Sequence, residues 1–189
     1  MKLILASSSP RRQELLKAAR IPFTVKPSHV PEVPHPSESP LRYSKRLARD
    51  KAAAVWNDLP HKSGHVVLGA DTIVVVDDHI LEKPVDDKDA TRMIRLIAGR
   101  GHEVISSVCL LGEEVDQLHS ATTTVYVNEM TEQEIAEYVA SGEPMDKAGA
   151  YGIQGMFSRW ILRVDGEYPN VVGLPIAMTY RILRDNGVI

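Results

Sequence analysis

Two adjacent arginines, Arg11 and Arg12, follow three serines and a proline in the stretch LASSSPRR. The pattern predicts a strand that turns into a helix at Pro10, and this places both cations in the first helical turn. The helix dipole disfavours cations there, whereas the free backbone N–H groups of the turn favour an anion. Arginine also binds phosphate oxygens bidentately. Two interpretations follow. Either Arg11 and Arg12 are simply solvated residues of the first turn, or the turn binds a polyanion.

Asp71 interrupts the apolar run VVLGADTIVVV. Aspartate is depleted from strand interiors and is costly to bury without a partner. A salt bridge or a capped bulge would explain it structurally. The functional interpretation is a carboxylate that binds Mg²⁺ or accepts a proton from water. Glu32, in a Pro-rich loop, is a second candidate carboxylate, although an exposed loop charge is the simpler interpretation.

Lysines occupy unusual positions in three further segments. On a helical wheel Lys51 falls inside the apolar arc, between Leu47 and Val55. Such a lysine needs a partner or must extend to solvent, and extension is the commoner outcome. Lys83 precedes a proline, and Lys147 lies in the loop DKAGAYGIQG, in which glycine recurs at every third position. This spacing permits close approach of a ligand to the backbone, and it also occurs in ordinary tight turns.

Short apolar runs alternate with amphipathic segments along the chain, which predicts an α/β fold with a mixed sheet. The predicted strands cover residues 2–7, two strands within 65–84 joined at Asp77 and Asp78, 102–112, 118–130, and a strand, turn and short strand within 160–175. The predicted helices cover residues 10–20, 39–57, 86–101, 131–142 and 176–187. Ser9, Ser39 and Thr131 are the predicted N-caps, the last with Glu134 in a capping box. Residues 27–40 form a long loop.

Composition narrows the class of protein. The chain has 189 residues, 43% of them hydrophobic and 25% charged, with a formal net charge of −3. These values suit one soluble domain over residues 1–189 and give no global basic field for nucleic acid. No stretch reads as a signal peptide or a membrane span, and no histidine pair has zinc spacing. The single cysteine, Cys109, favours a reducing compartment, so we expect a cytoplasmic protein without a membrane or nucleic-acid partner.

Six motifs occur in order along nearly the whole chain: LASSSPRR, LARDKA, LGADTIV, LEKP, DKAGAYGIQG and NVVGLP. With them the sequence resembles the Maf family of nucleoside triphosphate pyrophosphatases. The resemblance implies an elongated mixed sheet flanked by helices, in two lobes with a central cleft, as in inosine triphosphatases. It implies hydrolysis of a small-molecule nucleoside triphosphate to the monophosphate and pyrophosphate with a divalent cation, Mg²⁺ or Mn²⁺. A homodimer is one option for the assembly.

The motifs SPRR, GADT and GIQG match the subgroup that acts on dTTP and UTP. The resemblance implies a catalytic role for Asp71. It also implies that Glu32 and Asp71 bind the metal ion. It implies substrate contacts for Ser7, Ser9, Arg11, Arg12, Lys51, Thr72, Lys83, Lys147 and Gln154. Two alternatives stay open at this point: a pyrophosphatase for 7-methyl-GTP or a broader set of nucleotides, and a nucleotide-binding regulator that restrains cell division.

Overall fold

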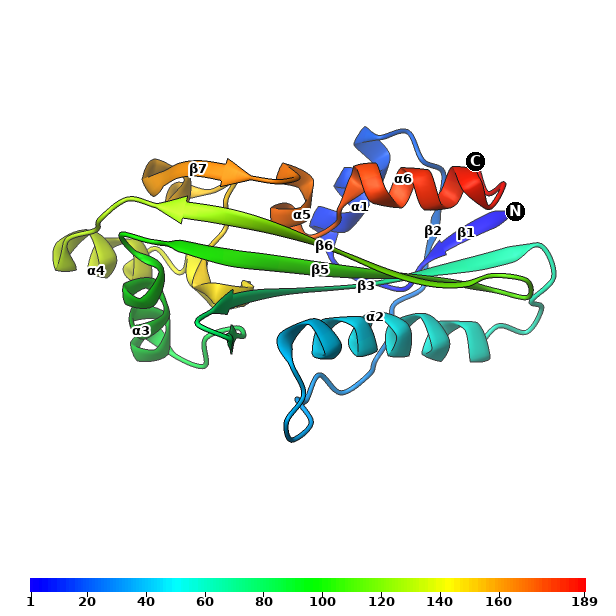
Figure 1. The fold of residues 1–189 in the computed structure, drawn as a ribbon, viewed down its shortest axis with the longest axis horizontal. Helices are drawn as coiled ribbons and strands as arrows, with labels where there is room; N and C mark the ends of the chain where they lie inside the picture. Colours follow the sequence, from blue (N-terminus) through cyan, green and yellow to red (C-terminus); the bar gives the residue numbers. More distant parts are fainter. The chain divides into compact units, whose positions relative to one another are not determined.

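The computed structural model describes residues 1–189 and shows the expected α/β fold (Figure 1). A seven-stranded sheet has the order β2-β1-β3-β5-β6-β7, with β4 paired to β3. Strand β1 runs parallel to β2 and β3, whereas β4 and β7 pair antiparallel, so the sheet is mixed as predicted. The strands are β1 (Lys2–Leu5), β2 (Thr24–Val25), β3 (His65–Val76), β4 (His79–Leu81), β5 (Gly101–Gly112), β6 (Asp116–Val127) and β7 (Ile161–Asp165).

The five predicted helices are all present, and a sixth is added. They are α1 (Pro10–Ala18), α2 (Pro40–Asn57), α3 (Asp87–Ile97), α4 (Glu132–Ala140), α5 (Tyr168–Val172) and α6 (Ile176–Asp185). The short strand predicted near residue 172 is wrong, because α5 occupies that place. Strand β2 was missed because its two residues are exposed and carry no apolar alternation. Ser39 and Thr131 cap their helices as predicted, and the capping box with Glu134 is formed.

The chain divides into two compact units. The first comprises residues 1–72, 106–121 and 173–189, and the second comprises residues 73–105 and 122–172. The glycine-rich segment of the second unit folds as short 3₁₀ turns at Glu143–Asp146, Ala148–Ala150 and Met156–Trp160.

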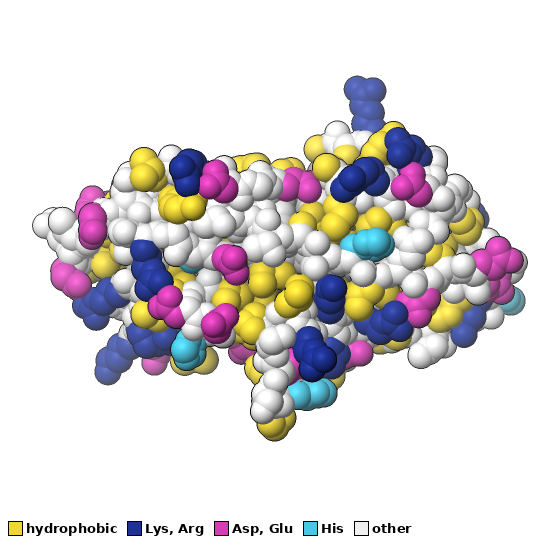
Figure 2. All heavy atoms as spheres, in the orientation of Figure 1, with side chains coloured by type: hydrophobic (Ala, Val, Ile, Leu, Met, Phe, Trp, Pro, Cys, Tyr) yellow, Lys and Arg dark blue, Asp and Glu magenta, His cyan; other side chains and the backbone are white.

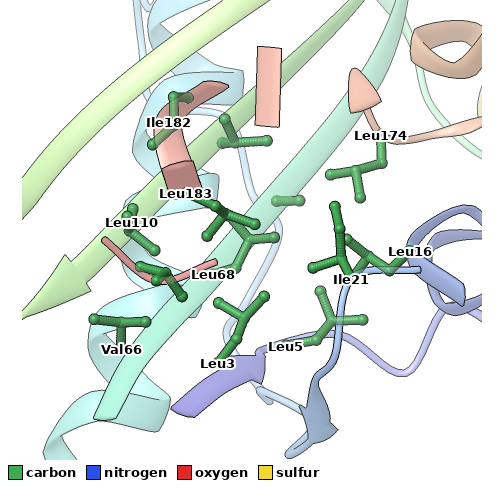
Figure 3. Close-up of a cluster of buried hydrophobic side chains, with 13 residues drawn as sticks. Leu3, Leu5, Leu16, Ile21, Val66, Leu68, Leu110, Leu174, Ile182 and Leu183 are labelled. Atoms are coloured by element: carbon green, nitrogen blue, oxygen red, sulfur yellow. The ribbon is translucent and has the colours of Figure 1, made fainter. Parts of the chain in front are cut away.

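The core of the first unit follows the period-two alternation of its strands. Leu3 and Leu5 of β1 pack in a cluster with Leu16 of α1 and with Ile182 and Leu183 of α6 (Figure 3). Ile4 of β1 and Ala6, just beyond the strand, pack against α2 in a second cluster. In Figure 1, α1 and α6 accordingly lie on one side of β1 and β3, and α2 lies on the other. Each face of this part of the sheet is therefore covered by helices.

The core of the second unit contains a cluster of aromatic side chains beside its many aliphatic ones. Tyr138, Tyr151, Phe157 and Trp160 form a chain of ring contacts with centroid separations of 4.7–6.0 Å. The ring of His102 joins this cluster edge-on to Tyr151, and its Nε2 lies 2.7 Å from the Tyr151 hydroxyl. The cluster thus connects Tyr138 of α4 with Tyr151 and Phe157 of the glycine-rich segment.

The face of the molecule shown in Figure 2 carries basic and acidic side chains interspersed with apolar ones. No helix is long and apolar enough to span a bilayer.

Candidate active site

The turn between β1 and α1 is the first part of the site. Ser9 occupies the N-cap position of α1, as predicted, but its side chain makes no capping hydrogen bond. Its backbone N–H donates instead to the hydroxyl of Ser7 at 3.2 Å. Ser7 itself is buried. The first turn of α1 therefore keeps backbone N–H groups without a side-chain cap from Ser9, which suits an anion.

Arg12 is held in place by three neutral oxygens. Its Nε donates to the carbonyl of Gly173 at 2.9 Å, and its two terminal nitrogens donate to the hydroxyls of Ser7 at 3.0 Å and Thr72 at 3.2 Å. Burial lowers the pKa of the guanidinium, opposed by the more distant charges of Asp71 and Glu32. The guanidinium is thus fixed in orientation, and its hydrogen bonds provide no countercharge. The half-buried Arg11 precedes it on the same turn.

Lys51 and Asp71 form the second part of the site. The Nζ of Lys51 lies 2.8 Å from Oδ1 of Asp71 and 2.7 Å from Oε1 of Glu32. Lys51 and Asp71 are buried, whereas the Glu32 side chain is 52% exposed. The apolar arc of α2 therefore does bury this lysine, and it has partners instead of reaching solvent. The salt bridge considered for Asp71 from the sequence is also present.

Gly69 explains how α2 comes so close to β3. A Cβ at this position would lie 2.1 Å from the carbonyl oxygen of Ala48 and 2.7 Å from the backbone nitrogen of Ala52, both on α2. Only glycine therefore permits this packing. Asp71 follows two residues later and points to the same face of the strand, where it meets Lys51.

One oxygen of Asp71 has no hydrogen-bond partner. Oδ1 accepts from Lys51, but Oδ2 is buried and unpaired. An unpaired carboxylate oxygen is costly to bury, so it marks a place where a further ligand or proton would be stabilised. No group of three or more acidic, histidine or cysteine side chains is arranged to hold a metal ion. Asp71 and Glu32 supply oxygens of the type that Mg²⁺ and Mn²⁺ prefer, and phosphate oxygens normally complete such a site.

The connections of the first unit place both parts of the site at one end of β1. Helix α1 follows β1 on one face, and α2 precedes β3 on the other, while β2 and β3 flank β1 on its two sides. In open α/β sheets, ligands commonly bind beyond the carboxyl ends of the strands at such a point of the topology. Ser7 continues directly from that end of β1.

The remaining predicted residues belong to the second unit. Lys83 is exposed just after β4. The Nζ of Lys147 donates to the carbonyl of Glu143 at 2.7 Å and pairs with Asp146 at 2.6 Å. Gln154 is exposed, between the buried Ile153 and the half-buried Gly155. The structure thus brings Ser7, Ser9, Arg12 and Thr72 into one hydrogen-bonded group and Glu32, Lys51 and Asp71 into another.

Neighbouring side chains of the protein explain why two positions of the loop are glycine. A Cβ at Gly155 would lie 2.3 Å from a carboxylate oxygen of Glu143, and one at Gly152 would lie 2.7 Å from Cε of Lys147. The Glu143 carboxylate also accepts hydrogen bonds from the backbone N–H of Met156 at 2.8 Å and from the Tyr138 hydroxyl at 3.2 Å. The space beside these two glycines is therefore occupied by side chains of the protein itself.

Sequence reasoning missed several residues that support the site. Gly173 contributes the carbonyl for Arg12, and only its motif, NVVGLP, pointed toward it. Arg46 binds Glu38 bidentately at 2.7 Å and donates to the carbonyl of Val33 at 3.0 Å. The hydrogen bond from Arg46 lowers the pKa of Glu38 to about 2. These contacts tie the Pro-rich loop that carries Glu32 to α2.

Fold and site together define an α/β protein with a fixed arginine and an uncapped helix N-terminus at the carboxyl end of its first strand. The chain belongs to the family described as Maf-like protein, whose family model matches residues 2–186. A dTTP/UTP pyrophosphatase of Koribacter versatilis is 58% identical over 189 residues, which cover 100% of this chain and 96% of that protein. A dTTP/UTP pyrophosphatase of a Geobacillus species is 45% identical, with 98% of each chain covered.

A third relative, the dTTP/UTP pyrophosphatase of Hahella chejuensis, is 43% identical over 99% of this chain and 93% of its own. Among solved structures, a nucleoside-triphosphatase / dITP/XTP pyrophosphatase of Mycobacterium abscessus aligns with 67% of this chain and 74% of its own, at 17% identity and a TM-score of 0.39.

Proposed function

We propose that this protein is a pyrophosphatase that hydrolyses dTTP and UTP to the nucleoside monophosphate and pyrophosphate. The observation that carries the proposal is Arg12, a fixed guanidinium bonded only to neutral oxygens at the start of α1. A triphosphate supplies the missing negative charge. The names of the full-length relatives support the choice of dTTP and UTP.

The turn from Ser7 to Arg12 binds the triphosphate. Ser7 accepts hydrogen bonds from Ser9 and Arg12, so its own hydroxyl proton remains for a phosphate oxygen. The N–H donors of Arg12 that its protein contacts leave unused do the same. Arg11 adds a second positive charge on the same turn. Together these groups neutralise and orient the phosphates, which is the main task of a catalyst for this type of transfer.

Asp71 is the proposed proton acceptor. Its Oδ1 stays on Lys51, while the unpaired Oδ2 orients a water molecule and takes its proton. The water oxygen forms a bond to the α-phosphorus, and the bond from that phosphorus to the bridging oxygen breaks. Pyrophosphate leaves with the electron pair of that bond. The reaction consumes one water and needs no other reactant.

Glu32 and Asp71 are the residues that would hold a divalent cation, Mg²⁺ or Mn²⁺, together with phosphate oxygens. Such an ion, when bound, withdraws charge from the phosphates and from the leaving pyrophosphate. Arg46 and Glu38 keep the Glu32 loop on α2, so the two carboxylates remain on one side of the site.

Residues of the second unit receive their roles from the family motifs. Lys83 and Lys147 are assigned to the substrate, and Gln154 is assigned to the edge of the base, where a carboxamide can donate and accept at once. We treat residues 1–189 as one catalytic domain and infer a cytoplasmic location from the single, buried cysteine. A homodimer remains part of the proposal.

Product analysis tests the reaction itself. Purified protein is incubated with UTP and Mg²⁺, and the products are separated by anion exchange. We expect UMP and pyrophosphate in equal amounts, without UDP or orthophosphate. Release of UDP and orthophosphate would show attack at the terminal phosphorus and would overturn the proposal. Tight nucleotide binding without any product would instead favour the regulator of cell division that the sequence left open.

A further inference from the structure

Lys51 shares its ammonium group between two carboxylates that differ in their surroundings. Asp71 lies on β3 with a side chain that is 5% exposed, whereas Glu32 lies in the Pro-rich loop with a side chain that is 52% exposed. The Nζ of Lys51 is 2.8 Å from a carboxylate oxygen of Asp71 and 2.7 Å from one of Glu32. One partner of the lysine is therefore fixed in the sheet, and the other reaches water.

The Pro-rich loop is held on both sides of Glu32. Before this residue, the hydroxyl of Ser28 donates to the carbonyl of Ala6 at 3.1 Å. After it, Arg46 donates to the carbonyl of Val33 at 3.0 Å. Because these contacts hold the backbone of the loop, rotation about the side-chain bonds of Glu32 is enough to move its carboxylate from one partner to another.

A divalent cation would compete with Lys51 for Glu32. The proposed function assigns Glu32 to such an ion, but its carboxylate already pairs with the positive charge of Lys51. An ammonium group and a divalent ion that share one carboxylate oxygen lie so close together that they repel each other strongly. Asp71 is different, because its Oδ1 accepts from Lys51 while its buried Oδ2 has no partner. The competition therefore concerns Glu32 in particular.

We propose that Glu32 is an exchangeable ligand: it pairs with Lys51 until a divalent cation enters, and it then transfers its carboxylate to the ion. Lys51 keeps its bond to Asp71 throughout. The transfer makes an N–H donor of Lys51 available to a phosphate oxygen. Binding of the ion and binding of the triphosphate are thereby coupled through one lysine. This inference rests on the proposed function, which supplies the ion and the phosphates.

A double-mutant cycle on the affinity for Mn²⁺, measured by electron paramagnetic resonance without nucleotide, tests the exchange. Glu32→Gln in the wild-type background should raise the dissociation constant by less than about 2-fold, because an ion that gains Glu32 must first take it from Lys51. Lys51→Gln removes this competitor and can still donate to Asp71. In the Lys51→Gln background Glu32→Gln should raise the dissociation constant by about 10-fold.

Equal effects of Glu32→Gln in the two backgrounds would overturn the proposal, because Glu32 would then serve the ion and Lys51 independently. Absence of Mn²⁺ binding in all four proteins would overturn it as well. Lys45→Gln is the matched control, since Lys45 is a half-buried lysine of the same helix. Glu32→Gln should keep its small effect, below about 2-fold, in the Lys45→Gln background. A large effect there would show that the total charge near the site governs the ion, which also contradicts the exchange.

A second measurement leaves Lys51 and Asp71 intact. In ¹⁵N NMR spectra of the lysine ammonium groups, the Lys51 signal is the one that Lys51→Gln removes. Saturating Mg²⁺ should shift this signal in the wild type in the same direction as Glu32→Gln shifts it without metal, because both changes take Glu32 away from Lys51. Mg²⁺ should add little shift in Glu32→Gln itself. A wild-type signal that Mg²⁺ leaves unchanged would overturn the exchange.

Neither measurement depends on turnover. A protein that shows both expected results and yet releases no pyrophosphate from UTP would support the exchange and contradict the proposed function. A protein that releases pyrophosphate but shows equal effects of Glu32→Gln in both backgrounds would contradict the exchange alone.

Discussion

Asp71 and Thr72 are consecutive on β3, yet their side chains bond to groups from helices on opposite faces of the sheet. Asp71 meets Lys51 of α2 at 2.8 Å, and Thr72 meets Arg12 of α1 at 3.2 Å. The alternation of a strand makes this inevitable, because neighbouring side chains point to opposite sides. One dipeptide thus connects the carboxylate that we propose activates water with the fixed guanidinium that we propose binds phosphate. The division of labour in the proposed mechanism depends on this relationship.

Replacement of Asp71 by asparagine removes the proposed base and preserves the shape of the side chain. We expect turnover of UTP to fall by about 10²- to 10⁴-fold. Asparagine can keep the hydrogen bond from Lys51, so circular dichroism should show a folded protein. Asp116→Asn is the control, since that carboxylate pairs with Arg49 on the surface. Turnover near the wild-type value in Asp71→Asn would remove Asp71 from the chemistry.

Arg12→Lys keeps the positive charge but loses the planar fork that reaches three oxygens at once. Nucleotide at about 100 times its dissociation constant should stabilise the wild type by about 2.7 kcal/mol, or roughly 5–10 °C in Tm. The variant should lose most of this shift. Arg184→Lys, at an exposed position near the end of α6, should retain it. Equal shifts in Arg12→Lys and the wild type would favour a solvated arginine that binds no phosphate.

His102 gives the stability of the protein a defined pH dependence. Burial, with a smaller contribution from Arg100, lowers its pKa from 6.5 to about 4. The folded state keeps the ring neutral, whereas the unfolded chain binds a proton below about pH 6.5. Stability is therefore fully present above that pH and is lost as the pH falls toward 4, by about 3 kcal/mol at ~1.4 kcal/mol per pH unit.

Urea unfolding of the wild type and His102→Asn at several pH values measures this effect. The difference in unfolding free energy between the two proteins should narrow by about 3 kcal/mol between pH 7 and pH 4. The exposed His119→Asn variant should follow the wild type at every pH. Parallel curves for the wild type and His102→Asn would mean that His102 does not titrate in this window.

Glu143 supports the loop that presents Gln154. Glu143→Gln replaces one acceptor oxygen by a donor, so either the Met156 N–H or the Tyr138 hydroxyl loses its acceptor. We expect a loss of about 1–3 kcal/mol in unfolding free energy and a drop in the UTP to CTP selectivity of the enzyme. Glu137→Gln, exposed on α4, is the matched control. Unchanged selectivity in a destabilised Glu143→Gln protein would confine Glu143 to a structural role.

Much of the fold was predictable because its signals are local. The apolar run of β3, the Ser-Pro start of α2 and the capping box at Thr131 each act within a few residues. The prediction failed for α5, which is only five residues long and depends on distant contacts. There the buried Asn170 donates to the carbonyl of Val104 and to the hydroxyl of Thr123. No pattern within the helix itself encodes those partners.

The same distinction applies to the site. Lys51 and Asp71 were visible as charges in apolar patterns, and they do lie together. Ser106 and Gly173 were not visible, because a serine in a strand and a glycine in a turn conflict with no local preference. Both contact Thr72, across more than 30 and 100 residues of chain respectively. Such contacts require the fold before they can be recognised.

The central claim is that the site selects dTTP and UTP. A carboxamide at Gln154 matches the adjacent carbonyl and N–H groups of uracil and thymine, whereas cytosine reverses them. Loss of such a pair costs about 1–3 kcal/mol, or roughly one to two decades in selectivity. The decisive measurement is kcat/KM of the wild type and Gln154→Ala for UTP, dTTP, CTP, 7-methyl-GTP and the purine triphosphates. In the wild type we expect kcat/KM for dTTP and UTP to be well above the values for all other nucleotides. In the variant we expect the ratio of kcat/KM for UTP over CTP to be near unity. A wild-type preference for 7-methyl-GTP, or a ratio that Gln154→Ala leaves unchanged, would contradict the account.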